Sequence, residues 1–150
     1  MELAAALAHL GRKLGGDPLV AGADGRVRLA FADGLELVLV PAARGRLVAE
    51  VGLGTLPAAP AQREERLRLL LARSLAAMRE SEEVLALDEE GGGGGRLTLW
   101  RHLSLPELTP AGLEEAVAGL LDRAEWLRAD PAAATATRRP PAAGPLLLFP

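Results

Sequence analysis

Three short alternating stretches follow one another with only a few residues between them: 26–32, 35–40 and 46–53. In the first stretch Val27, Leu29 and Phe31 occupy every second position, which is the period of a half-buried strand. Asp33-Gly34 and Arg44-Gly45 provide turn residues in the gaps. Strands joined this closely must pair antiparallel, because a parallel pair needs a crossover of about a dozen residues or more. The pattern therefore predicts a three-stranded antiparallel meander.

Two further strands are predicted later in the chain. Residues 83–88 form a short apolar stretch, and residues 96–105 form the longest alternating one. In the second of these, leucines at 97, 99, 103 and 105 fall on one face, and Trp100 with His102 falls on the other. Five consecutive glycines, at 91–95, separate the two stretches and are typical of a hairpin connection.

Helical periodicity surrounds these strands. Residues 2–15 carry leucines at 3, 7, 10 and 14 on one stripe, and Gly15-Gly16 ends the pattern. A second helix is predicted over 61–79, after a loop over 54–62. The last helix begins at Pro110, with Thr109 as its N-cap, and runs to about residue 129. The order α-β-β-β-α-β-β-α predicts an α+β domain over 1–129, with an antiparallel sheet and flanking helices. An Ala/Pro-rich flexible tail is predicted over 130–150.

The residues that carry catalysis or bind metals are missing or poorly placed. The chain has no Cys, and no other ligands stand near His9 or His102 at a metal-site spacing. The glycine run lacks the Lys-Ser/Thr and the helix of a phosphate loop, and no Gly-x-Ser-x-Gly elbow is present. Adjacent acidic pairs such as Glu82-Glu83 and Glu114-Glu115 point in different directions and are interpreted as solvated charge. We therefore expect a binding protein rather than an enzyme, without a metal or cofactor.

Charge and hydropathy narrow the class of partner. The chain of 150 residues has 17 basic and 20 acidic side chains and a net charge of −3, without the basic excess of a nucleic-acid-binding protein. Its beginning lacks the basic start and continuous apolar stretch of a signal peptide. Its apolar runs are too short to cross a bilayer, so no membrane insertion is expected. A protein of the cytoplasm that binds another protein fits these features.

Several hydrophobic segments resemble a known family. They are Leu53-Gly54-Thr55-Leu56-Pro57, the helix around Leu67–Leu71, Val84-Leu85-Ala86-Leu87-Asp88, Leu97-Thr98-Leu99-Trp100 with Leu103, and the helix Leu113–Trp126. Together with the element order, they are similar to the specialised type III secretion chaperones of the Tir-chaperone (CesT-type) family over about residues 2–129. The chain departs from the family at Ser74, where a small Asn is expected, in its longer glycine run and in the 130–150 tail.

The resemblance implies a function. It implies a homodimer in the bacterial cytoplasm that binds the N-terminal segment of a secreted effector, the client, and keeps it soluble and secretion-competent without ATP. A module of the same fold that regulates or adapts another protein outside secretion remains the alternative.

Two sets of apolar residues are candidates for these contacts. The client-binding candidates lie on the first helix and the first two strands: Leu7, Leu14, Val27, Leu29, Phe31, Leu35 and Leu37. For Leu29 and Leu37 a place in the core is the better prediction, whereas Val27 is expected to be exposed. The dimer-interface candidates lie on the second helix and the last strand: Leu67, Leu70, Leu71, Ser74, Leu75, Met78 and Trp100.

The tail contains one apolar segment, Leu146-Leu147-Leu148-Phe149, among its five prolines. Two hypotheses stay open for it. The segment belongs to an inert tail, or it rests in the client groove as a stand-in until a client arrives.

Overall fold

The computed structural model describes residues 2–16, 19–31, 34–77, 79, 82–88 and 95–129. The predicted tail, Met78 and most of the glycine run lie outside these ranges. Within them the predicted order α-β-β-β-α-β-β-α and the α+β class are confirmed. The elements are α1 (Leu3–Lys13), β1 (Val27–Ala30), β2 (Glu36–Ala42), β3 (Arg46–Thr55), α2 (Pro60–Ala77), β4 (Val84–Asp88), β5 (Arg96–Ser104) and α3 (Pro110–Arg128).

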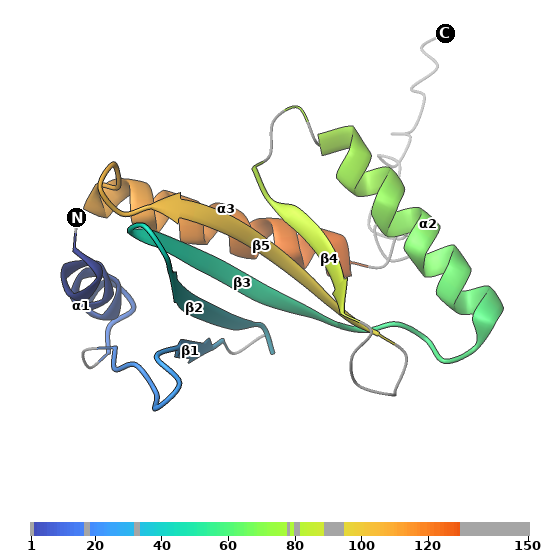
Figure 1. Ribbon diagram of the computed structural model, residues 1–150. Coiled ribbons are helices and arrows are strands. Elements are labelled where there is room, and N and C mark those ends of the chain that lie inside the picture. The colour runs from blue at the N-terminus through green and yellow to red at the C-terminus, as the bar shows by residue number, and fades with distance from the viewer. Residues whose placement is uncertain are drawn as a thin grey trace, which may run out of the picture.

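The described strands form one antiparallel sheet in the order β1-β2-β3-β5-β4 (Figure 1). The turn between β2 and β3 places Arg44 and Gly45 in the left-handed region, with φ values of 62° and 67°, which suits the right-handed twist of a hairpin. After α2, strands β4 and β5 form a hairpin. β5 pairs with β3, and β4 is an edge strand of the sheet. The other edge strand is β1.

The core lies between one face of this sheet and the helices α1 and α3, which Figure 1 shows packed on the same side. Buried leucines and valines of neighbouring strands lie side by side in register, as in the row Leu37–Val51–Leu99. The inner side of α3 faces them with these buried residues: Leu113, Ala116, Val117, Leu120, Ala124 and Leu127. On the opposite face the rings of Trp100 and His102 meet edge to face, with centroids 4.8 Å apart.

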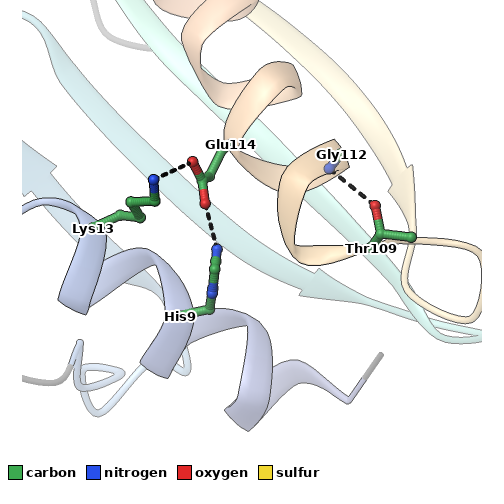
Figure 2. Close-up of polar contacts among 5 residues, drawn as sticks. All are labelled: His9, Lys13, Thr109, Gly112 and Glu114. Carbon is green, nitrogen blue, oxygen red and sulfur yellow. Dashed lines mark hydrogen bonds and ion pairs between the residues drawn. The ribbon is translucent and has the colours of Figure 1, made fainter.

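A polar contact fixes α1 against α3 (Figure 2). One carboxylate oxygen of Glu114 lies 2.6 Å from His9 Nε2, and the other lies 3.1 Å from Lys13 Nζ. The prediction that the pair Glu114-Glu115 is only solvated charge is therefore wrong for Glu114. Figure 2 also shows the predicted N-cap, in which Thr109 Oγ1 accepts a hydrogen bond from the Gly112 backbone N–H at 3.0 Å.

Helix α2 packs loosely, and Leu70 is its buried residue among those described. Arginines connect it to the end of α3. Arg73 Nη1 donates to the carbonyls of Trp126 and Ala129 at 2.8 and 3.0 Å, and Arg66 Nη2 donates to the carbonyl of Leu127 at 3.1 Å. These donors satisfy carbonyls that a helix end leaves without an intrahelical partner.

Most element boundaries differ from the predicted ones by one or two residues. The predicted loop 54–62 is shorter, because β3 continues to Thr55 through pairing of Gly54 and Thr55 with β5. The first helix stops at Lys13, so Leu14, which was assigned to its apolar stripe, is instead its C-cap residue.

Candidate partner-binding surfaces

Large apolar side chains are exposed where α2 meets the edge strand β4. The exposed fraction is 61% for Leu71, 70% for Leu75 and 43% for Val84. Leu71 and Leu75 are four residues apart and share one face of α2, since neighbours at this spacing lie one above the other on a helix. We define the α2–β4 surface by five residues: Leu67, Leu71, Ser74, Leu75 and Val84.

A hollow of about 240 Å³ opens beside this surface. Its walls come from α2, from the start of β4, from β5 and from α3: Leu71, Ser74, Glu83, Val84, Leu85, Leu99 and Arg123. Leu85 and Leu99 are a cross-strand pair, and Leu99 belongs to the core. The hollow therefore lies at the edge of the sheet, where α2 leaves the core-face residues Leu85 and Leu99 open beside Val84, whose side chain belongs to the other face.

The structure brings most of the predicted dimer residues to this surface. Leu71 and Leu75 are exposed, and Leu67 and Ser74 are half-buried. Trp100 is paired in register with Val84, one strand in from the edge. The prediction for Leu70 is corrected, because this side chain is 0% exposed and packs in the core. Met78 lies outside the described residues.

Three residues at the hollow were missed in the sequence. Val84 belongs to a predicted apolar strand but is absent from the dimer candidates, and Arg123 has no local signal, because it lies outside the stripe of α2. Glu83 was assigned to solvated charge, yet its side chain is only 10% exposed and lies 3.6 Å from Arg101 Nη1. A charge that pairs across the chain leaves no pattern in the sequence around it.

A second exposed apolar set lies between the end of α1 and β1. Leu14 is 47% exposed and Val20 is 80% exposed, while Leu29 and Phe31 are half-buried against the core. We define the α1–β1 surface by these four residues. Val20 was missed in the sequence, since it lies in a connection without periodicity.

The remaining client-binding candidates belong to the core. Leu7, Leu35 and Leu37 are 8%, 1% and 0% exposed, and Val27, which was expected to be exposed, is only 3% exposed. The reason is that Val27 is on the face of the sheet that the helices cover, in register with the buried Leu39. The candidates that remain accessible on this side are thus Leu14, Leu29 and Phe31.

The outer edge of β1 lies next to the α1–β1 surface. In the described sheet β1 pairs with β2 alone, so its other side presents backbone donors and acceptors to a further strand. Arg28, within β1, binds Asp24 of the turn before the strand, with 2.6 Å between Nη2 and Oδ2. The hydrogen bond from Arg28 lowers the pKa of the Asp24 carboxyl to about 2. This pair fixes the chain as it enters the edge strand.

The described residues hold no group of three or more His, Cys, Asp or Glu side chains that could bind a metal ion. Within the same residues, no helix has the length and hydropathy to cross a membrane.

The fold is one that chains of chaperone–effector complexes share. The chain is similar to a chain of the HopA1–SchA chaperone–effector complex, with 25% identity and a TM-score of 0.66 over 83% of this chain and 91% of that one. It is also similar to a chain of the ExsC–ExsE complex, with 24% identity and a TM-score of 0.65 over 85% and 95%. The complex of the Yersinia pestis type III secretion chaperone SycH with a fragment of YscM2 follows, with 20% identity and a TM-score of 0.60 over 83% and 98%.

The family itself follows from the sequence match. The model of the Tir chaperone protein (CesT) family matches residues 5–128, and the chain belongs to this family. No functionally curated protein matches it.

Proposed function

We propose that the protein is a type III secretion chaperone of the bacterial cytoplasm, which binds the N-terminal segment of an effector and keeps it soluble and secretion-competent without ATP. The family match over residues 5–128 is the observation that carries this proposal. The HopA1–SchA complex supports it, because that structure is a chaperone–effector complex at 25% identity.

The proposed active form is a homodimer that joins through the α2–β4 surface. Its exposed leucines are on one helix face, and a twofold contact pairs such a face with itself. A stable contact buries about 800 Å² on each partner, which requires more than two leucines. Trp100 and Val84, adjacent on the open face of the sheet, would extend the contact area.

The proposed client site is the α1–β1 surface with the free edge of β1. An extended client segment would add a strand to this edge through its backbone groups. Its apolar side chains would contact Leu14, Val20 and Phe31, which are the accessible apolar residues at this end of the sheet.

The test is titration calorimetry of the purified protein with an effector N-terminal fragment. Leu14→Asp and Val20→Asp place charges on the α1–β1 surface and should weaken binding at least about tenfold, because each buries an unpaired charge under the client. Val27→Asp is unsuitable, since that residue is in the core and the fold would be lost.

Ala8→Asp is the matched control, because Ala8 is exposed on α1 outside the surface. It should bind like the parent. Normal binding by both surface variants, with circular dichroism unchanged, would rule out this client site. Absence of binding by the parent to any effector fragment encoded beside its gene would count against the function itself.

A further inference from the structure

The end of α3 lies directly beside the hollow. Arg123 of α3 lines it together with Leu71 and Ser74 of α2. Past α3, the carbonyl of Ala129 accepts a hydrogen bond from Arg73 of α2 at 3.0 Å. The chain beyond residue 129 therefore leaves the domain at α2. The α1–β1 surface is at the opposite edge of the sheet (Figure 1).

The sequence past this point contains one apolar segment, Leu146–Phe149, after sixteen residues that are mostly Ala, Pro, Thr and Arg. A Gly/Ser-rich linker of sixteen residues has an end-to-end distance of about 20–25 Å, and the prolines make this linker longer, up to about 50 Å when it is fully extended. A short tether of this kind gives an effective concentration in the millimolar range at nearby sites. Even a weak apolar contact with the hollow would then be populated.

The segment Leu146–Phe149 lies outside the part of the chain that matches the family. The family match ends at residue 128, and the similar chains are covered to 91–98% by 83–85% of this chain. Residues past 129 therefore lie outside the part of the chain that the family model matches.

We propose that the segment Leu146–Phe149 docks into the hollow of its own protomer, against Leu71, Val84 and Leu85. Because Ala129 contacts Arg73 of α2, the chain past α3 starts beside this hollow and not beside the α1–β1 surface. The segment therefore occupies part of the proposed dimer interface and not the proposed client site. Leu71, Ser74 and Val84 belong both to the hollow and to the α2–β4 surface. A docked segment therefore competes with a second copy of the chain, and this competition rests on the proposed homodimer.

Competition predicts a weaker dimer in the full chain than in one that ends at residue 130. If the segment is docked in about two thirds of the free protomers, one third are competent to associate. Since both protomers must be competent, the apparent dissociation constant of the dimer rises about ninefold.

Docking is tested first, with a synthetic peptide of residues 140–150 added to the chain of residues 1–130. The peptide has no Trp, whereas the ring of Trp126 lies 4.2 Å from the Arg123 guanidinium at the hollow. Saturable change in Trp fluorescence with a Kd of about 1 mM or lower is expected. Leu71→Asp with Val84→Asp should abolish it, and the exposed Ala118→Asp on α3 should not. No saturation at several millimolar peptide, or equal binding by the hollow variant, overturns the proposal.

Competition is tested by sedimentation equilibrium of the full chain and of residues 1–130. The shorter chain should dimerise about tenfold more tightly, and Leu147→Asp with Phe149→Asp in the full chain should match it. Ala134→Asp, which adds a charge to the same tail, should behave like the parent. Equal or weaker association of the shorter chain overturns the competition. If neither chain dimerises, the homodimer is refuted, and the peptide titration still decides whether the segment docks.

Discussion

Single residues determine how α1 is attached to the domain. Both carboxylate oxygens of Glu114 contact side chains of α1, one His9 and the other Lys13. Because an ionised carboxylate can only accept hydrogen bonds, Nε2 of His9 is the donor. The hydrogen bond from His9, followed by that from Lys13, holds the pKa of the Glu114 carboxyl below its ordinary value. Because the pKa of this carboxyl is lower in the folded protein than in the unfolded chain, the contact stabilises the fold at pH values above the unfolded-state pKa. This stabilisation is lost as the pH falls through the folded-state pKa.

Glu114→Gln should therefore be less stable than the parent at neutral pH, because the amide is uncharged and only its oxygen can accept a hydrogen bond from His9 or Lys13. The difference should shrink as the pH falls below the ordinary pKa of a glutamate and through the lowered pKa of the folded Glu114 carboxyl, where the parent side chain becomes neutral as well. Urea unfolding at several pH values measures it. The neighbouring and exposed Glu115→Gln is the control. Equal loss in both variants, or a loss that does not depend on pH, would contradict this role.

At the scale of elements, α2 is the helix whose position depends least on the core. Its side chains are exposed or half-buried except for Leu70, and its connection to α3 is largely polar. Two cation–π contacts to the Trp126 ring add to this connection. The Cζ atom of Arg73 on α2 lies 5.0 Å from the ring centroid, and that of Arg123 on α3 lies 4.2 Å from it. A helix held in this way keeps its leucines available to a partner.

Arg73→Ala should loosen α2 and lower stability by about 1 kcal/mol, since it removes two hydrogen bonds to carbonyls and one cation–π contact. Amide hydrogen exchange should accelerate in α2 more than in β3. Arg68→Ala is the matched control on the same helix, because its pairing with Glu64 is between exposed side chains and contributes little. A control variant as unstable as Arg73→Ala would refute the anchoring role.

In the molecule as a whole, features set by neighbouring residues can be predicted from the sequence. Element order, the Thr109 cap and the faces of Trp100 and His102 follow from local patterns, and the structure confirms them. Periodicity identifies an apolar stripe, yet it does not say what covers it. Val27 is therefore buried under the helices while Leu71 is exposed. The contact of Glu114 with α1 and the hollow beside α2 both join segments that are far apart in the chain, so no local pattern predicts them.

The two partner surfaces lie at opposite ends of one sheet, and dimerisation would place two α1–β1 surfaces on a single particle. A client that is unfolded when free loses about 2–5 kcal/mol on ordering, so a large contact area is required. We expect a variant that cannot dimerise to bind its client more weakly, although its α1–β1 surface is intact.

Leu71→Asp with Leu75→Asp should give a folded monomer, because both side chains are exposed and their replacement leaves the core unchanged. Its affinity for an effector fragment should fall at least about tenfold in calorimetry, since a single α1–β1 surface offers half of the area that offsets the ordering of the client. Ala76→Asp, on another face of α2, should remain dimeric and bind normally. A monomer that binds the client at parental affinity would show that one protomer carries the whole site, and that the dimer serves another purpose.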